Sequence, residues 1–348
     1  MNPAAPAPPR WIVGPGYDGT FFIGAAALTF VFLGLYEALK AWGLAPSGPA
    51  ALLTYFAFTA LLDLPHIFQT FARTHADPVE FARRRPLYTW GLPLVMAAGL
   101  LVPALGLEAP FTAFLALYGS HHIIRQHVGF LRVYQGLNEP VPTLDQGLDR
   151  LAFELGLYAC VLHEYAAEFG DAWTRTVPVY GKWVATYPTV PAALVEGLTQ
   201  LAALVLGAWL LRQLYRAALG ERLNGPKIAL MLAALSTHYV VFLVASVPFL
   251  VAEAIETAYH DAQYHGWMMH YQRRRFPAHA RIVLKWGGAA LAYGLLAGTI
   301  EVLGYTQDLF YWVFAPLGML TLFHYYIDGR IWRFREQPEL RSLLHPAT

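Results

Sequence analysis

Long apolar stretches alternate with short polar connections along the whole chain. A helix that spans a bilayer needs ~20 mostly apolar residues, and about ten stretches meet that requirement. They cover residues 20–39, 50–73, 87–106, 110–132, 147–168, 190–216, 227–247, 249–272, 282–304 and 308–331. Pro248 is the predicted break between the seventh and the eighth, because proline interrupts a helix. The pattern predicts an all-α fold, a polytopic transmembrane helix bundle.

The basic residues between these stretches alternate in a way that sets the orientation. Arg and Lys cluster after every even-numbered stretch, for example at 83–85 and 273–275, whereas the connections at 106–110 and 304–308 have neither. Lys and Arg concentrate in the cytoplasmic loops of membrane proteins. The alternation therefore predicts that both termini lie in the cytoplasm, and we expect a multi-pass protein of a bacterial inner membrane.

The composition agrees with a membrane protein and excludes several other classes. Hydrophobic residues make up 57% of the 348 residues and charged residues 14%, whereas soluble domains have roughly 25% charged residues. The net charge of +1 provides no basic surface for nucleic acid. The single cysteine, Cys160, excludes a disulfide framework and a multi-cysteine zinc site.

Three parts are expected along the chain. Residues 1–18 are rich in Pro and Ala and are predicted to be a disordered tail, residues 19–335 a single membrane domain, and residues 336–348 a short cytoplasmic tail. The longest outer connection, 169–189, carries Trp and Tyr, which favour the membrane interface. We expect this connection to lie on the membrane.

The thirteen histidines stand out in a chain that otherwise avoids polar side chains. Measured from the basic rim at ~1.5 Å per residue, several of them share one layer of the cytoplasmic half, roughly 9–20 Å deep. The members of this layer are His66, His121, His122, His238, His260, His265 and His324. Ionisable side chains at such depth are costly and mark functional sites, and helix bundles hold metals between facing helices. Whether His238, or His127 nearer the rim, is a ligand stays open, and His163 is expected to form an interhelical hydrogen bond.

Carboxylates accompany these histidines at helical spacing. Residues three or four apart share a helix face, so each carboxylate is a candidate ligand or a group that orients a ligating imidazole. The pairs are Asp63 with His66, Glu256 with His260, Asp261 with His265, and Asp328 with His324.

Two pairs of histidines cannot point the same way on a regular helix. His260 and His265 are separated by about 140° around the axis. Facing one ion together therefore requires a distortion such as a π-bulge; otherwise two metals lie on either side of the helix. His121 and His122 are ~100° apart, so one is expected to face the site and the other a neighbouring helix.

Two further polar residues are candidates for catalysis. Arg125 is costly in lipid and can hold a carboxylate or an oxygen ligand. Tyr264 lies beside His265, where a phenol near a metal can relay protons. Asp63 and Asp328 have an alternative role as structural ion pairs with Arg125 or Arg330.

The ligand set favours one metal chemistry. Histidine and carboxylate without a layer of cysteine or methionine suit non-heme iron, and zinc or manganese less specifically. Iron that activates O2 inside a bilayer implies a lipophilic substrate arriving from the lipid, whereas zinc would indicate hydrolysis. A bis-histidine heme would leave most of the histidines unexplained. A divalent-metal transporter needs polar residues along its whole path, and the outer half has few.

Four segments resemble the histidine boxes of known membrane enzymes. They are 62–66 (LDLPH), 120–127 (SHHIIRQH), 260–265 (HDAQYH) and 324–328 (HYYID). They are similar in kind to the boxes of integral-membrane non-heme iron enzymes, the group of fatty-acid desaturases, hydroxylases and alkane monooxygenases. A second resemblance is to the bacterial carotene-cleaving oxygenases of the Brp/Blh type, whose histidines are dispersed over several helices. The spacings depart from the usual HxxxH and HxxHH boxes, and both resemblances imply iron, O2 and a hydrophobic substrate.

The sequence therefore predicts a membrane-embedded oxidoreductase with a non-heme, dinuclear iron site. The expected reaction is O2-dependent hydroxylation, desaturation or oxidative cleavage of a lipophilic molecule, with an external electron donor where the substrate does not supply the electrons. The ligand pool is His66, His121, His122, His260, His265 and His324, with Asp63, Glu256, Asp261 and Asp328 bridging or orienting. The alternatives are a heme-bearing electron-transfer protein and a divalent-metal transporter. The substrate, the donor and the oligomeric state stay open.

Overall fold

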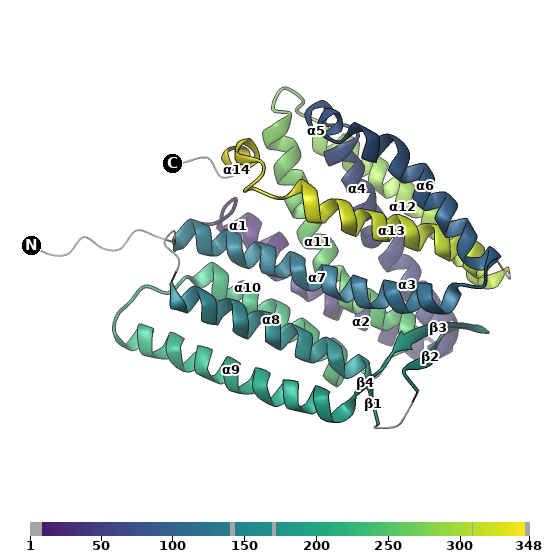
Figure 1. The fold of residues 1–348 in the computed structure, drawn as a ribbon, viewed down its shortest axis with the longest axis horizontal. Coiled ribbons are helices and arrows are strands. Elements are labelled where there is room, and N and C mark those ends of the chain that lie inside the picture. Colours follow the sequence, from purple (N-terminus) through teal and green to yellow (C-terminus); the bar gives the residue numbers. More distant parts are fainter. Residues whose placement is uncertain (1–8, 140–142, 169–171, 308, 345–348) are drawn as a thin grey trace, which may run out of the picture. The chain divides into compact units, whose positions relative to one another are not determined.

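The computed structural model describes residues 9–139, 143–168, 172–307 and 309–344, and most of them are helical (Figure 1). The α-helices are α1 (Pro15–Asp18), α2 (Ala27–Ala41), α3 (Ala51–Phe58), α4 (Leu64–Thr74), α5 (Pro78–Arg83), α6 (Arg85–Ala104), α7 (Glu108–Asn138), α8 (Leu144–Glu164), α9 (Ala192–Ala218), α10 (Gly225–Tyr239), α11 (Phe249–Arg275), α12 (Ile282–Thr306), α13 (Phe310–Ile331) and α14 (Pro338–Leu344). This confirms the predicted helical class.

Short helices of other types join several of these elements. Four are π-helical: η1 (Gly19–Ile23), η3 (Pro46–Ala50), η4 (Thr59–Asp63) and η5 (Val240–Val244). One, η2 (Gly24–Ala26), is a 3-10 helix. Helix η5 ends at Val244 and α11 begins at Phe249 with Pro248 as its N-cap, so the predicted break at Pro248 is confirmed.

The chain folds as two compact units. Unit 1 comprises residues 1–26, 123–173 and 188–245, and unit 2 comprises residues 27–122, 174–187 and 246–348. The hydropathy pattern predicts a single domain over residues 19–335. It does not reveal this division, because α7 runs without interruption through the boundary between residues 122 and 123.

Unit 1 is built around α8, which packs against both α9 and α10 (Figure 1). Thr143 caps α8 by accepting a hydrogen bond from the backbone N–H of Gln146. Residues 1–8 of the expected N-terminal tail lie outside the described residues. The rest of that segment has defined contacts: the carboxylate of Asp18 accepts the N–H of Ile12 at 2.7 Å and the hydroxyl of Tyr134 at 2.8 Å.

Unit 2 has α11 at its centre, packed against α2, α3 and α4, with α12 against α4 and α6 along α13. Most side chains of α11 are buried. Gly294 permits the close approach of α12 to η4 and α4, because a Cβ atom there would lie 2.3 Å from the carbonyl oxygen of Ala60 and 2.6 Å from the Pro65 ring. Tight packing of this kind fixes the position of the residues that follow η4.

The π-turn of η4 has a cause in the sequence. Pro65 lies in the first turn of α4, and proline lacks an N–H while its ring clashes with the carbonyl four residues earlier. The backbone widens into a π-turn at Thr59–Asp63. Of the two alternatives for His260 and His265, the helix distortion is not found: α11 is a regular α-helix from Phe249 to Arg275, and the π-turn lies beside His66 instead.

Among the described residues, six helices are long and apolar enough to cross a membrane. They are Pro15–Ala41, Pro46–Thr74, Arg85–Ala104, Ala192–Ala218, Gly225–Val244 and Ile282–Thr306. The other four predicted stretches correspond to α7, α8, α11 and α13, which are equally long but carry more polar residues.

Four short strands interrupt the helical pattern where only an interfacial segment was expected. In unit 1, β1 (Ala166–Ala167) pairs in parallel with β4 (Val190–Pro191). In unit 2, β2 (Thr174–Tyr180) and β3 (Trp183–Pro188) form a hairpin whose turn uses a positive φ of 56° at Gly181. The indole N–H of Trp183 donates to the carbonyl of Tyr305 at 2.9 Å and anchors the hairpin to α12. Residues 169–171 of the connection lie outside the described part.

Candidate metal centre

Four helices of unit 2 each bring one imidazole to a common point. His66 comes from α4, His122 from α7, His260 from α11 and His324 from α13. The ring centroids of His66 lie 4.9 Å from His260 and 4.4 Å from His324, and those of His122 lie 5.0 Å and 5.3 Å from the same two rings. We call these four residues the histidine cluster. All four are buried, His122 with 9% and the others with 2% or less of their surface exposed.

Several nitrogens in this cluster have no hydrogen-bond partner among the described residues. They are the Nε2 atoms of His66, His122 and His324. Leaving one buried polar atom unsatisfied costs about 1–3 kcal/mol, and three such atoms in one place are unusual for a folded interior. Metal ions bound to these rings would satisfy them.

Carboxylates border the cluster on two sides. Oδ1 of Asp261 lies 3.0 Å from Nδ1 of His66, although the angle is not that of a hydrogen bond. Oδ2 of Asp328 lies 3.9 Å from Nε2 of His324. Ligand atoms within 4.8 Å of one another form three groups: His66 with His122 and His260, His122 with His324 and Asp328, and Asp63 with His66 and Asp261.

A second layer of side chains lies one helical turn beyond three of the histidines. Thr70 follows His66 by four residues, Tyr264 follows His260, and Asp328 follows His324. The Tyr264 hydroxyl donates to Oδ1 of Asp328 at 2.9 Å and lies 3.3 Å from Oγ1 of Thr70, which is 2.5 Å from Nδ1 of His324. These contacts therefore connect α4, α11 and α13 one helical turn beyond the histidines.

The structure separates the predicted ligand pool. His66, His122, His260 and His324 come together with Asp63, Asp261 and Asp328. His265 instead contacts the carbonyl of Leu62 through Nε2 at 3.1 Å, and only its ring edge approaches His66, at 6.5 Å between centroids.

Two other predicted members lie outside these groups. His121 is exposed and stacks with Tyr118, with 6.2 Å between the ring centroids, so His122 is the one of the pair that faces the cluster. Glu256 accepts a hydrogen bond from Ser120 at 3.4 Å.

Arg125 and three further histidines, His127, His163 and His238, belong to unit 1. Arg125 pairs with Glu154 at 3.0 Å rather than with Asp63 or Asp328. His127 and His238 lie with their ring centroids 5.5 Å apart. His163 contacts Thr199 on α9 at 3.1 Å, which confirms the predicted interhelical contact.

Thr70 is the residue of this site that sequence reasoning missed. A threonine in an apolar stretch carries little signal by itself. The signal was its position four residues after His66, which repeats the spacing of Tyr264 after His260 and of Asp328 after His324.

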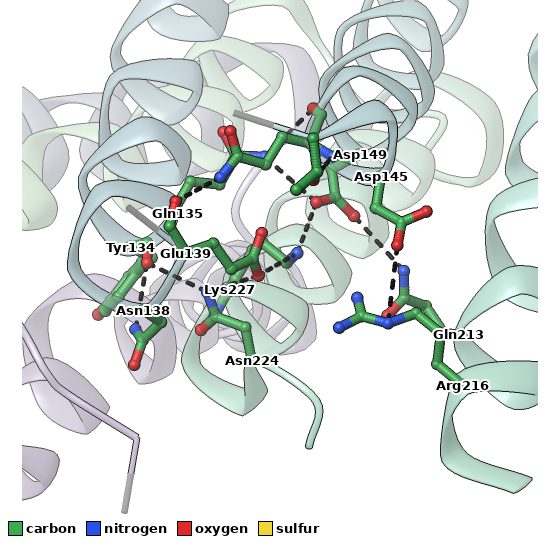
Figure 2. A network of polar contacts seen from close by, with 12 residues as sticks. Tyr134, Gln135, Asn138, Glu139, Asp145, Asp149, Gln213, Arg216, Asn224 and Lys227 are labelled. Carbon is green, nitrogen blue, oxygen red and sulfur yellow. Dashed lines mark hydrogen bonds and ion pairs between the residues drawn. The ribbon is translucent and has the colours of Figure 1, made fainter. Parts of the chain in front are cut away.

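Unit 1 contains a different polar cluster, which Figure 2 shows. Lys227, fully buried, lies 2.5 Å from Asp149 and 2.8 Å from Glu139. Asp149 also accepts hydrogen bonds from Gln135 and from the indole of Trp209. In the sequence, Lys227 lies at the start of the predicted stretch 227–247, among the basic residues that separate it from the stretch before. Its burial among carboxylates is not visible in the sequence.

A third set of charges lies at the end of unit 2 where α4 and α11 finish. Asp77 binds Arg275 through both oxygens, at 2.9 and 3.0 Å, and accepts a hydrogen bond from Tyr271. Burial alone would raise the pKa of Asp77, but the hydrogen bonds from Arg275 and Tyr271 and the charge of Arg73 lower that pKa below its ordinary value. These residues line a cavity of about 100 Å³ beside α14.

Comparison with protein families, with curated proteins and with solved structures finds no match to this chain. The function is therefore inferred from the geometry of the histidine cluster and its carboxylates. Chemically, four neutral imidazoles with adjacent carboxylates suit a divalent first-row metal such as iron, zinc or manganese.

Proposed function

We propose that this chain is a membrane-embedded, metal-dependent oxidoreductase whose non-heme iron site is built on the histidine cluster. The observation that carries the proposal is the convergence of four buried imidazoles from four helices, with three Nε2 atoms that have no partner among the described residues. Bound iron would supply O2-dependent oxidation of a lipophilic substrate. The protein would hold the ion, exclude bulk water and admit the substrate from the lipid.

The donor geometry favours a non-heme ion over heme. Two imidazoles that ligate one heme lie on opposite faces of a flat macrocycle. Here the four ring pairs meet edge to face, with interplanar angles of 71° to 88° and centroids 4.4 to 5.3 Å apart. Rings in direct contact leave no layer for a macrocycle between them.

The carboxylates extend the proposal to a dinuclear site. One ion would be held by His122 and His324 with Asp328, and the second by His66 with Asp63 and Asp261, in line with two of the ligand groups. His260 shares the remaining group with His66 and His122. We retain His265 and Glu256 as candidates for outer roles, whereas His121 is exposed and stacks with Tyr118. Tyr264 keeps a role beside the metal as part of this proposal, whereas Arg125 pairs with Glu154 in unit 1.

The finer topology also belongs to the proposal. Helices α7, α8, α11 and α13 have 31, 21, 27 and 22 residues, enough to span a bilayer at ~1.5 Å per residue. With the six apolar spans they give ten, and the basic clusters then place both termini in the cytoplasm of a bacterial inner membrane. An oxygenase of this kind would take electrons from an external donor or from its substrate.

Metal analysis of the detergent-purified protein, with an absorption spectrum of the same sample, tests the proposal. We expect stoichiometric iron without a Soret band in the wild type, loss of iron in His260→Gln, and retention in the matched control His121→Gln, whose imidazole faces away from the cluster. A Soret band would replace the proposal with a cytochrome. Zinc together with metal flux in proteoliposomes would replace it with a transporter, and a metal-free folded protein would contradict it.

A further inference from the structure

Two candidate ligands of one ion, His324 and Asp328, are joined by a chain of hydrogen bonds that passes through two other helices. The chain runs from Nδ1 of His324 to Thr70 on α4, then to Tyr264 on α11, and returns to Oδ1 of Asp328 on α13. His324, Thr70 and Tyr264 are buried, with 5% or less of their surface exposed, and Asp328 has 9%. Each contact therefore has a donor and an acceptor that the protein itself must supply.

The direction of each hydrogen bond in this chain follows from counting protons. The hydroxyl of Tyr264 donates to Oδ1 of Asp328, and this bond uses the one proton of that hydroxyl. The Tyr264 oxygen can then only accept from Thr70, which spends its own proton in the same way. Thr70 is left as an acceptor toward His324, so Nδ1 of His324 must carry the ring proton.

The position of the ring proton determines which nitrogen of His324 can bind a metal. A neutral imidazole protonated on Nδ1 has a bare lone pair on Nε2, and Nε2 of His324 is the atom without a hydrogen-bond partner among the described residues. In most metal sites the ligating histidine donates its second N–H to a carboxylate, a carbonyl or a water, which fixes the tautomer and raises the basicity of the ligand. In this protein the carboxylate would act at a distance, through one threonine and one tyrosine.

We propose that Thr70 and Tyr264 are positioning residues that fix the Nε2-ligating tautomer of His324 and link its ring to the carboxylate of Asp328. The inference rests on the proposed function, because it assigns a metal ligand. The remaining oxygen of Asp328, Oδ2, lies 3.9 Å from Nε2 of His324. The same carboxylate can therefore anchor the chain with one oxygen and face the ion with the other.

The decisive variant is Thr70→Val, which keeps the shape of the side chain and removes the hydroxyl. Thr70→Ser restores the hydroxyl and serves as the rescue. Thr74→Val is the matched control: Thr74 is buried one turn further along α4, but its hydroxyl donates to the backbone carbonyl of Thr70 rather than to the chain. These three variants separate the loss of one hydroxyl at this position from the general effect of a valine in α4.

The first readout is the tautomer of His324 in the metal-free protein, measured by NMR with ¹⁵N-labelled histidine and assigned by the signal that His324→Gln removes. We expect the Nδ1–H form in the wild type, Thr70→Ser and Thr74→Val, and a mixture of tautomers in Thr70→Val. An Nε2–H form in the wild type would overturn the inference. This measurement does not depend on whether the protein binds iron.

The second readout is metal affinity, measured by competition with a chelator for Fe²⁺, together with the visible spectrum of the Co²⁺-loaded protein. Removing such an orienting group typically weakens metal binding about 10–100-fold, so we expect this loss and a shifted Co²⁺ spectrum in Thr70→Val alone. Equal affinity in Thr70→Val and Thr74→Val would overturn the inference while the proposed function stands. A wild type that binds neither metal would overturn the proposed function and, with it, the role assigned here to His324.

Discussion

The two buried polar clusters of this protein differ in how their polar atoms are satisfied. In unit 1, the ammonium of Lys227 has carboxylates at 2.5 and 2.8 Å, and Asp149 also accepts from Trp209 and Gln135 (Figure 2). In unit 2, the histidine cluster has ring nitrogens with no hydrogen-bond partner in the described part of the chain. The first cluster supplies its own counter-charges, whereas the second lacks a partner that an ion would provide.

This difference separates a structural role from a binding role. Buried charges are tolerated when they are paired and hydrogen-bonded, so the Lys227 network holds α7, α8 and α10 of unit 1 together without any ligand. The Nε2 atoms of His66, His122 and His324, which have no partner among the described residues, gain little from one another. A bound cation would account for their convergence. Substitutions in the histidine cluster should therefore change metal affinity, and substitutions in the Lys227 network should change the stability of the fold.

The largest expected effect is on stability in unit 1. Lys227→Met leaves Asp149 buried without its cation, and removing one partner of a buried ion pair typically costs about 3–5 kcal/mol. We expect a large drop in the thermal midpoint of the detergent-solubilised protein. The metal content per folded chain should be unchanged, because the histidine cluster is not touched.

An exposed lysine pair provides the control for this change. Lys40 pairs with Glu37 at 2.8 Å, with 34% and 54% of the two side chains exposed, and such surface pairs contribute about 0–1 kcal/mol. Lys40→Met should therefore leave the midpoint nearly unchanged. If Lys227→Met were equally mild, the network of unit 1 would not have the structural role assigned to it.

A smaller effect is expected from the packing that positions the cluster in unit 2. Gly294→Ala would place a Cβ 2.3 Å from the backbone oxygen of Ala60, and forcing extra atoms into a packed interior costs about 1–3 kcal/mol. Because Ala60 belongs to η4, the shift should move Asp63 and His66 and weaken Fe²⁺ binding as well as stability.

Gly298 lies one turn along the same helix and is the matched control. A Cβ at this position would meet its nearest neighbours at 3.4 Å, so Gly298→Ala requires only a small adjustment. Chelator competition and thermal unfolding of both variants check the difference. Equal iron affinity in the two variants would show that the position of η4 does not set the geometry of the centre.

Much of the helical fold could be predicted from hydropathy, and part of the site from spacing. The stretches with ~20 apolar residues became helices, and the break at Pro248 lies where proline chemistry puts it. The number of residues between each histidine and the basic rim places His66, His122, His260 and His324 in one layer. Depth does not report rotation about the helix axis, and this is why His121 and His265 shared the layer without joining the cluster.

Other features depended on contacts between distant segments. A π-turn was one of two alternatives for the helix of His260 and His265, but a π-turn is found at η4, where Pro65 disrupts the helix. Arg73 and Lys227 look like rim residues in the sequence, yet each is almost fully buried with carboxylate partners from other elements. A one-dimensional pattern gives the position of a charge along its helix and says nothing about its partners across the fold.

The smallest expected effect concerns the charges at the end of unit 2, which extend the comparison to a cluster outside the spans. Asp77 faces Arg73, Arg275 and Tyr271, with Glu80 beside Arg73, and its pKa is lowered below the ordinary value. A lowered pKa means that the ionised form stabilises the fold above the unfolded value, near 3.9, and that this contribution is lost as the pH falls through the folded value. We expect Asp77→Asn to lower the thermal midpoint at neutral pH, and we expect its difference from the wild type to begin to shrink only as the pH falls below about 4. A difference that stayed constant down to pH 3 would mean that the hydrogen bonds of Asp77, rather than its charge, hold α5 to the end of α11. A measurement at neutral pH alone would not separate these two contributions.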